Sequence, residues 1–348
     1  DVAMQLLGNF YEYYLNNKSE KINIVVATSG DTGAAAIDAI KGKKNVNIFV
    51  LHPNNRISPV QRKLMTTGKE KNVFNIAVEG SFDDCQNIVK AMFADKAFAN
   101  EIKMSGVNSI NWARIIAQSV YYFYSYFLVK DNGDPINFSV PTGNFGDVYA
   151  GYLAKKIGLP INKFVVATNQ NDILHRAITN GAYKVENVLE TISPSMDIQI
   201  ASNFERLIFD LNDHSDKKTI DVMRSIKEKG KYEIEKEFLD KINVDFLSSR
   251  MDENEVLNTI KSVYEKFDKI LDPHSAIGYG AFDKVNLKGN NIVLATAHPC
   301  KFPDAIEKAI KIKAELPSEL AFILDEKENY DILENNLNKI KQHIKERI

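Results

Sequence analysis

Cysteine is scarce in this sequence: Cys85 and Cys300 are the only two among 348 residues, and they lie far apart without CxxC spacing. This excludes a disulfide scaffold and a cysteine-based zinc or iron–sulfur site, and it is typical of a reducing compartment. No His/Asp/Glu spacing indicates a metal site either. We therefore expect no metal and a cytoplasmic location.

An excess of charge of one sign and long apolar runs are also missing. The chain has 44 Lys and Arg against 46 Asp and Glu, a formal net charge of −2. Such a balance gives no reason to expect a nucleic acid or an anionic membrane as partner. The longest apolar stretches have the length of strands, so we expect no transmembrane helix, and no secretory signal pattern is visible.

What the sequence does contain is a repeated alternation of short apolar runs and helical segments. Predicted strands lie at residues 22–28, 46–51, 73–78, 136–140, 164–168 and 292–296. Short buried strands that alternate with helices predict an α/β fold with doubly wound, mainly parallel sheets. At roughly 100–200 residues per domain, the length predicts two domains.

A polar turn at residues 131–135 is the predicted domain boundary, with a smaller α/β domain at 1–130 and a larger one at 131–348. From about 203 to 270 the sequence is rich in Lys and Glu and shows no strand pattern, which predicts a helical insertion. The Lys/Glu-rich end of the chain predicts a helical C-terminus. Ligands of open α/β sheets bind beyond the carboxyl ends of the strands, so the loops there are the candidate sites.

The loop Ser-Val-Pro-Thr-Gly-Asn-Phe-Gly-Asp at 139–147 joins a predicted strand to a helix. Gly143 and Gly146 permit positive φ, so consecutive backbone amides can turn toward one anion, and the helix N-terminus adds positive charge. The motif is neither GxGxxG nor a Walker loop. A tight turn that needs glycine only for its geometry explains the same residues, and both interpretations stay open.

Two further loops carry groups suited to anions. Residues 27–33 offer hydroxyls and glycines at a helix start, although capping by Asp31 or Thr32 explains that pattern too. Residues 108–114 gather amides, a hydroxyl and the Arg114 guanidinium, which suits a phosphoryl group, although an Asn cap and a surface Arg are an alternative. His52 and His298, also at strand ends, are more often core or turn histidines than bases.

The amino-acid sequences of these loops resemble those of one family. Its signatures are matched by ATSGDTGAAA at 27–36, VNSINWARI at 107–115, VPTGNFGDVYAGYLAKKIGLP at 140–160 and TAHPCKFPDAI at 296–306. They resemble threonine synthases, pyridoxal-phosphate enzymes of the tryptophan-synthase-β-like fold (fold type II), and SPSMDIQIASNFERLIFDL at 193–211 resembles their longer microbial branch. The resemblance covers nearly the whole chain.

This resemblance implies a lyase of threonine biosynthesis that uses pyridoxal 5′-phosphate. It would convert O-phospho-L-homoserine and water into L-threonine and phosphate by β,γ-replacement, as a monomer or weak homo-oligomer. The implied cofactor contacts are Gly143, Asn144, Phe145, Gly146 and Asp147 for the phosphate, Thr296 for the pyridine nitrogen and Asp31 for the phenolic oxygen. The implied substrate contacts are Ser29 and Thr32 for the carboxylate, and Ser109, Asn111 and Arg114 for the phosphate.

No residue of the chain matches the family's catalytic lysine. The opening Asp1-Val2-Ala3-Met4 resembles the stretch directly after that lysine, so we expect the Schiff-base lysine immediately before Asp1 and a further N-terminal region upstream. The alternatives are another fold-type-II enzyme, such as a serine/threonine dehydratase, and a catalytically inactive threonine-synthase-like binding protein. A nicotinamide dehydrogenase is disfavoured because no GxGxxG follows a strand.

Overall fold

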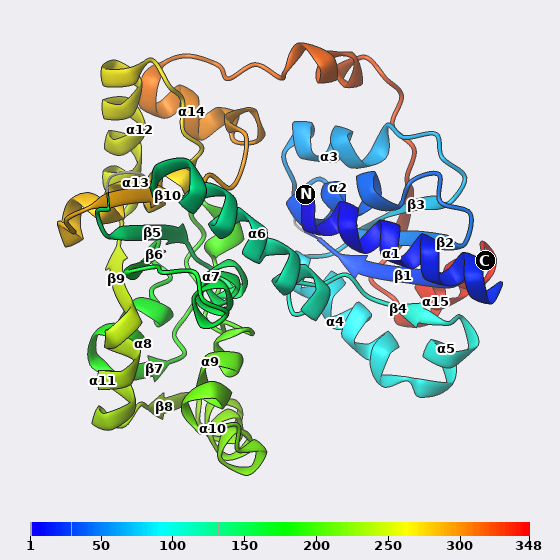
Figure 1. Ribbon diagram of the computed structural model, residues 1–348. Coiled ribbons are helices and arrows are strands. Elements are labelled where there is room, and N and C mark those ends of the chain that lie inside the picture. Colours follow the sequence, from blue (N-terminus) through cyan, green and yellow to red (C-terminus); the bar gives the residue numbers. More distant parts are fainter. Residues whose placement is uncertain (1, 29, 131–132) are drawn as a thin grey trace. The chain divides into compact units, whose positions relative to one another are not determined.

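The computed structural model describes residues 2–28, 30–130 and 133–348, which form two compact units (Figure 1). Unit 1 comprises Asp1–Ala117 and Leu316–Ile348, and unit 2 comprises Gln118–Glu315. Each unit is built around its own parallel sheet.

The sheet of unit 1 has the strand order β11-β3-β2-β1-β4. Its strands are β1 (Ile22–Ala27), β2 (Val46–Pro53), β3 (Val73–Glu79), β4 (Met104–Ser105) and β11 (Asp331–Glu334). Its helices are α1 (Val2–Lys18), α2 (Asp31–Ile40), α3 (Pro59–Thr66), α4 (Phe82–Ala94), α5 (Lys96–Glu101), η4 (Ser318–Leu324) and α15 (Leu337–Lys345). Helices cover both faces of this sheet.

The central strand β2 shows how the two faces are filled, because side chains alternate between the faces of a strand. Ile48 and Val50 belong to the apolar cluster that includes residues of α1 and α2. Phe49 and Leu51 belong to the cluster that includes residues of α4 and α15. A strand buried on both faces explains why β2 is a continuous apolar run in the sequence.

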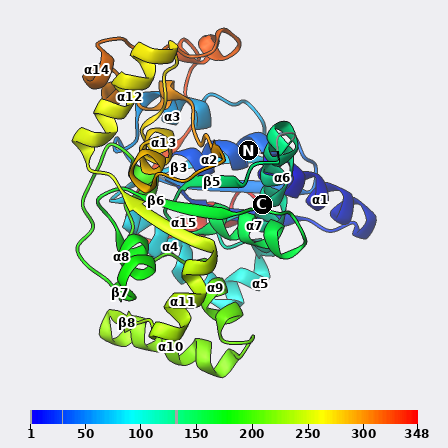
Figure 2. The same ribbon diagram turned by 60° about the vertical axis from the view of Figure 1, so that its left-hand side comes forward.

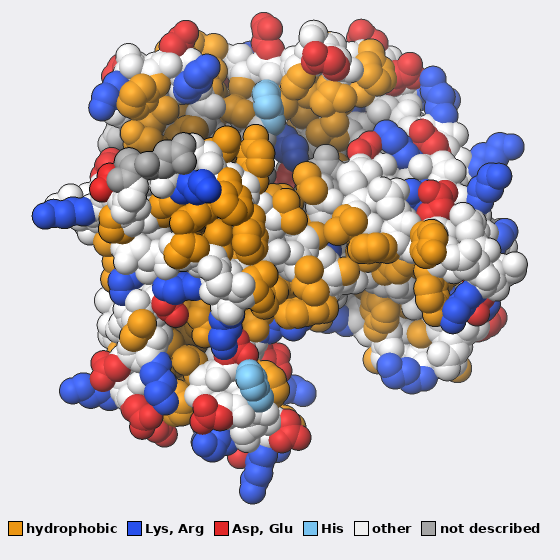
Figure 3. Space-filling view, in the orientation of Figure 1, with side chains coloured by type: hydrophobic (Ala, Val, Ile, Leu, Met, Phe, Trp, Pro, Cys, Tyr) orange, Lys and Arg blue, Asp and Glu red, His pale blue; other side chains and the backbone are white. Residues whose placement is uncertain are grey.

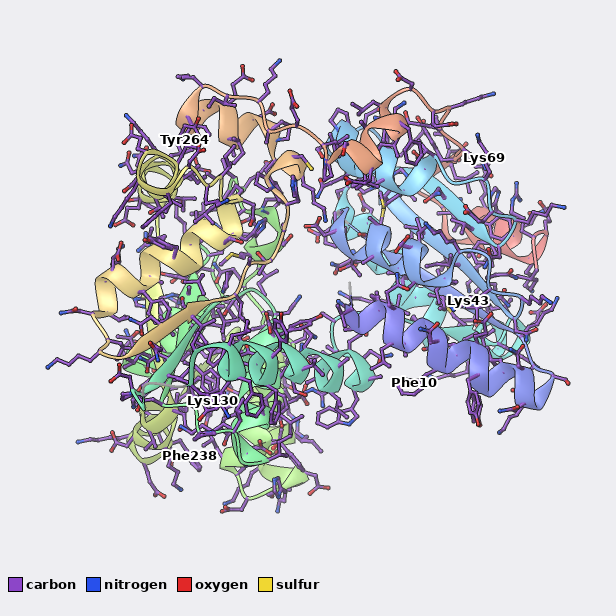
Figure 4. The ribbon with its side chains drawn as sticks, turned by 45° about the horizontal axis from the view of Figure 1, so that its top comes forward. Phe10, Lys43, Lys69, Lys130, Phe238 and Tyr264 are labelled. Atoms are coloured by element: carbon purple, nitrogen blue, oxygen red, sulfur yellow. The ribbon has the colours of Figure 1, made fainter. Side chains whose placement is uncertain are left out.

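α1 packs on unit 1 through one of its faces. It buries Met4 and Leu7 beneath it, whereas Phe10, labelled in Figure 4, is 56% exposed. Lys43, also labelled there, lies with its Nζ 3.0 Å from Glu12 Oε2, which ties α1 to the loop after α2. The helix is therefore fixed to unit 1 through one face.

The sheet of unit 2 has the strand order β10-β5-β6-β9, and all its pairs are parallel. Its strands are β5 (Ile136–Pro141), β6 (Lys163–Thr168), β9 (Phe246–Arg250) and β10 (Asn290–Val293). Its helices are α7 (Gly146–Lys156), α8 (Ile173–Asn180), η2 (Pro194–Met196), α9 (Phe204–Leu211), α10 (Asp216–Lys229), α11 (Lys236–Asp245), α12 (Glu253–Phe267), α13 (Pro273–Val285), η3 (Pro299–Lys301) and α14 (Pro303–Ile310). α13 packs across all four strands (Figure 2). A two-stranded antiparallel sheet of β7 (Ala182–Lys184) and β8 (Lys231–Glu233) lies with α10 away from this sheet.

The fold class predicted from the sequence is confirmed, but the division between the units differs from the predicted one. It falls within α6 (Trp112–Val129), between Ala117 and Gln118, rather than at 131–135, where residues 131 and 132 lie outside the described part. Residues 316–348 also belong to unit 1, because β11 pairs with β3 and α15 packs on α4. The expected helical C-terminus therefore contains a strand as well.

The helical insertion predicted at about 203–270 is wrong in one respect. This stretch contains two strands: β8, which pairs with β7, and β9, the edge strand of the unit 2 sheet, which pairs with β6. The β9 sequence Phe-Leu-Ser-Ser-Arg has only two apolar residues, since an edge strand is not enclosed on both sides. β9 was missed because it lacks the apolar run that marks β2 or β5.

α6 is the longest described helix, with 18 residues. Hydrophobic side chains gather along its course in Figure 3, and the exposed ones include Val120, Tyr124 and Leu128. Among the residues that the structure describes, no helix is both long and apolar enough to cross a membrane.

The assignment of residues 316–348 to unit 1 predicts that their apolar residues stabilise it. Ile340 on α15 is fully buried, so Ile340→Ala should lower the free energy of unfolding by about 2–5 kcal/mol. Ile348→Ala is the matched control, because Ile348 is 53% exposed and its truncation should cost less than about 0.5 kcal/mol. Urea unfolding followed by circular dichroism measures both, and equal effects of the two changes would contradict the assignment.

Candidate active site

The loop after β5 presents several backbone amides together. Thr142 extends the sheet, since its amide donates to the Ala167 carbonyl at 2.8 Å. Within the described part of the chain, the amides of the next four residues donate to no protein acceptor, and these residues are Gly143, Asn144, Phe145 and Gly146. α7 starts at Gly146 and adds the positive end of its dipole. Such a group of amides fits a phosphate.

The backbone of this loop is held in a strained conformation. Phe145 has φ 64°, the left-handed region, which costs roughly 1–3 kcal/mol for a residue other than glycine. Its side chain is 1% exposed, and its ring centroid lies 5.3 Å from that of Phe204 and 5.8 Å from that of Phe246. The apolar core therefore enforces the turn, and strain of this kind is typical of binding loops.

Gly143 is required by the packing of the protein itself. A Cβ atom at this position would lie 2.7 Å from the Ser195 carbonyl oxygen and 3.3 Å from the Met196 Cα atom. Only glycine lets the η2 segment approach the loop so closely. Neither Gly143 nor Gly146 has the positive φ that the sequence interpretation invoked, since the left-handed residue of the loop is Phe145. The glycine at 143 is needed for close packing, and the anion site stays a prediction.

Asp147, the last residue of the predicted phosphate site, directs its side chain to another partner. The Tyr122 hydroxyl lies 2.8 Å from the Asp147 carbonyl oxygen and 3.2 Å from its Oδ1. Burial raises the pKa of Asp147 to about 6, although the hydrogen bond from Tyr122 opposes that shift. The carboxyl group thus helps to anchor the start of α7, while the backbone remains the candidate anion ligand.

Thr296 follows β10, the strand next to β5. Val293 lies beside Ser139 in the parallel register, and the Leu294 amide donates to the Ser139 carbonyl. The loops after these two strands therefore begin at neighbouring positions on one edge of the unit 2 sheet. The Thr296 amide donates to Ser275 Oγ at 3.0 Å, which fixes its backbone.

The loop after β1 in unit 1 contains Asp31 and Thr32, whereas Ser29 lies outside the described residues. Thr28 Oγ1 accepts hydrogen bonds from the amides of Gly30 and Gly33, at 3.0 and 2.9 Å. Thr28 therefore accepts from a free amide in the first turn of α2. The alternative interpretation, in which Asp31 or Thr32 caps the helix, is wrong, because both residues lie within that first turn. Asp31 Oδ1 accepts from Gln61 Nε2 at 3.3 Å.

The loop after β4 brings Ser109, Asn111 and Arg114 into one half-buried segment. β4 pairs with β1, so this loop and the one after β1 leave neighbouring strands. Asn111 Oδ1 accepts from the Ala113 amide at 3.0 Å, so the predicted Asn cap of α6 is present. Arg114 is more than a surface residue, because its Nη1 donates to the Val107 carbonyl at 2.8 Å.

The two histidines at strand ends have structural surroundings. His52 is fully buried, and burial lowers its pKa. His298 Nδ1 accepts from the Cys300 amide at 3.2 Å and so begins η3. Among the described residues, no group of three His, Cys, Asp or Glu side chains could hold a metal ion.

Sequence reasoning missed several residues that hold these loops. They are Gln61, Tyr122, Asp272, His274 and Ser275. Asp272-Pro273 is a capping pattern that indicates the start of α13, but the local sequence does not indicate which loops this helix contacts.

Comparison with known proteins defines the class to which this fold and these loops belong. The family described as pyridoxal-phosphate dependent enzyme matches residues 3–244, and the chain has the fold-type-II architecture of that class. The family described as threonine synthase, C-terminal, matches residues 275–344. The chain belongs to the threonine synthase family of pyridoxal-phosphate-dependent lyases, and its cofactor is pyridoxal 5′-phosphate.

Individual relatives give the same result. Threonine synthase of Pseudomonas aeruginosa is 44% identical over 347 residues, which are 99% of this chain and 74% of that protein. The structure of PLP-bound threonine synthase from Brucella melitensis has a TM-score of 0.96 and 46% identity over 100% of this chain and 75% of that one. Yeast threonine synthase has a TM-score of 0.93 and 40% identity, with the same two coverages. The predicted family, fold type and cofactor are thus confirmed.

The raised pKa of Asp147 predicts a pH-dependent stability. Because the folded state holds this proton up to about pH 6, against an ordinary value of 3.8, the group's stabilising protonated form is lost as the pH rises through 6. Asp147→Asn cannot ionise and its amide oxygen can still accept from Tyr122. Its urea midpoint, relative to the natural protein, should therefore rise between pH 4 and 7, by the equivalent of about 1–3 kcal/mol.

This comparison uses cofactor-free full-length protein, so that bound phosphate does not contribute. Asp283→Asn, on the exposed side of α13, is the control and should show a constant difference across the same pH range. A pH-independent difference for Asp147→Asn would show that the carboxyl is ionised throughout.

Proposed function

We propose that this chain provides the cofactor and substrate contacts of an enzyme that converts O-phospho-L-homoserine and water into L-threonine and phosphate. The observation that carries the proposal is the set of amides after β5, beside Thr296, in a chain of the threonine synthase family. When bound, pyridoxal phosphate supplies an electron sink for negative charge that develops on the substrate carbons. The residues of the chain bind and orient the cofactor and the substrate, and they polarise the reacting groups.

In this proposal the cofactor is held within unit 2 at two points. The amides of the loop from Gly143 to Asp147 donate to its phosphate, and the Thr296 hydroxyl donates to its pyridine nitrogen. A hydroxyl donates a hydrogen bond there without giving up its proton, so the ring nitrogen stays neutral. Asp31 is the proposed neighbour of the phenolic oxygen, and Gln61 Nε2, which donates to its Oδ1 at 3.3 Å, helps to hold the carboxyl group in place.

The substrate contacts are proposed in unit 1. Thr32 and Ser29 are assigned to the α-carboxylate, and Ser109, Asn111 and Arg114 to the phosphate that leaves. Arg114 suits this role because its planar group has five N–H donors, and the bond to Val107 uses one of them to set its direction. Donors fixed in advance stabilise the charge that grows on a departing phosphate.

Three further expectations complete the proposal. The protein acts on a small molecule in the cytoplasm, in keeping with two buried, unpaired cysteines. It is a monomer or a weak homo-oligomer, which light scattering would measure. The cofactor is expected to be held through a lysine, and mass spectrometry of the protein after borohydride reduction would locate that residue.

Arg114 separates this activity from that of a serine/threonine dehydratase, whose substrates carry no phosphate. Arg114→Ala should lower kcat/KM for O-phospho-L-homoserine by about 100–1000-fold, because a charge-assisted contact in the transition state is lost. Cofactor occupancy, read from the cofactor absorbance, should stay unchanged. Arg56→Ala, an exposed arginine of the same unit, is the control.

Any of three results would refute the assignment. Loss of the cofactor from Arg114→Ala would mean that the two phosphate sites have been exchanged. Faster turnover of L-threonine than of O-phospho-L-homoserine by the natural protein would identify a dehydratase instead. Absence of any turnover despite full cofactor loading would favour a binding protein.

A further inference from the structure

The first turn of α13 contains three buried polar residues to which the proposed function gives no role. Asp272, His274 and Ser275 are 1%, 3% and 2% exposed. Asp272 begins the helix: its Oδ1 accepts from the His274 amide at 2.9 Å and its Oδ2 from the Ser275 amide at 3.3 Å. Polar groups buried this deeply lower the stability of the fold unless they are hydrogen-bonded, so their hydrogen-bond partners indicate what they do.

His274 connects this turn to the phosphate loop. Its Nε2 lies 3.3 Å from the Ser195 amide, and its Nδ1 lies 2.9 Å from Asp272 Oδ1. An amide can only donate, so Nε2 accepts and the ring proton resides on Nδ1, where it donates to Asp272. The neighbouring Ser195 carbonyl is the group that a Cβ atom at Gly143 would strike at 2.7 Å.

Ser275 connects the same turn to the other cofactor contact. Its Oγ accepts from the Thr296 amide at 3.0 Å. The helix also lies against the strand that leads to the phosphate loop, because Ser139 Oγ donates to the Gly278 carbonyl at 2.6 Å. One rigid helix therefore contacts the segments that carry both proposed cofactor ligands.

We propose that Asp272, His274 and Ser275 are positioning residues, which set the phosphate loop and Thr296 at the separation that pyridoxal phosphate requires. The inference rests on the proposed cofactor contacts within unit 2. Asp272 orients the His274 ring through Nδ1. His274 accepts from the Ser195 amide and so holds the η2 segment next to Gly143, and Ser275 accepts from the Thr296 amide and so fixes the Thr296 backbone. We assign none of the three to direct contact with the cofactor. The division of labour is specific: His274 acts on the phosphate end and Ser275 on the pyridine end.

Pyridoxal, which lacks the phosphate, distinguishes the two ends. Cofactor-free full-length protein is titrated with pyridoxal phosphate and with pyridoxal, and both dissociation constants are read from the cofactor absorbance. His274→Phe keeps a ring against Phe302, whose centroid is 4.8 Å away, but cannot accept from Ser195. It should weaken pyridoxal phosphate by about 10–100-fold and pyridoxal by less than about threefold.

Ser275→Ala should weaken both ligands by the same factor, about 3–10-fold, since both carry the pyridine nitrogen. His274→Gln offers an amide oxygen to Ser195 and should restore most of the phosphate preference, and it serves also if His274→Phe fails to fold. Ser225→Ala removes a hydrogen bond to Lys231 far along the chain and should leave both constants unchanged.

The outcomes are distinguishable. An equal loss of both ligands in His274→Phe, or no recovery of the preference in His274→Gln, would reduce His274 to a general stabiliser and overturn the inference. That result leaves the proposed function intact as long as the natural protein prefers pyridoxal phosphate. If the natural protein binds both ligands equally, the phosphate site at 143–147 is itself wrong.

Discussion

Backbone amides that are to bind one anion cannot also be bonded within the protein, and the site depends on this constraint. A loop with four such amides loses its own hydrogen bonds, so its neighbours must hold it. The aromatic core fixes Phe145 in a strained conformation, the Ser195 carbonyl closes against Gly143, and Tyr122 bonds to Asp147. The rigidity of the loop comes from these contacts rather than from the loop itself.

The same constraint governs the charge around the loop. An ionised carboxylate at Asp147, one residue beyond Gly146, would interact favourably with the helix dipole but repel a phosphate dianion. Burial shifts the pKa of Asp147 upward, which reduces the cost of placing this carboxyl group near a phosphate. The Tyr122 hydroxyl donates a hydrogen bond to its Oδ1. The substrate phosphate is assigned instead to Arg114, whose positive charge can follow a leaving group. Backbone amides suit a permanent ligand, and a guanidinium suits one that departs.

The sequence predicted the parts of this architecture that have a local pattern. β2 and β5 are mainly apolar, buried runs followed by turn residues, so both the strands and the loops that follow them could be predicted. β9 and β11 lie at sheet edges with two apolar residues each, and no apolar run marks them. His274 bonds to Ser195 across 79 residues, and Thr296 to Ser275 across 21. Such contacts arise only from packing, so the residues that position the site could not be found from spacing.

The assignment of two different anions to two different loops is the central claim. A crystal structure of the full-length protein with pyridoxal phosphate tests this directly. We expect the cofactor phosphate within hydrogen-bond distance of the amides of Gly143, Asn144, Phe145 and Gly146, with Thr296 at the pyridine nitrogen. A cofactor phosphate bound by Ser109, Asn111 and Arg114 instead would contradict the account.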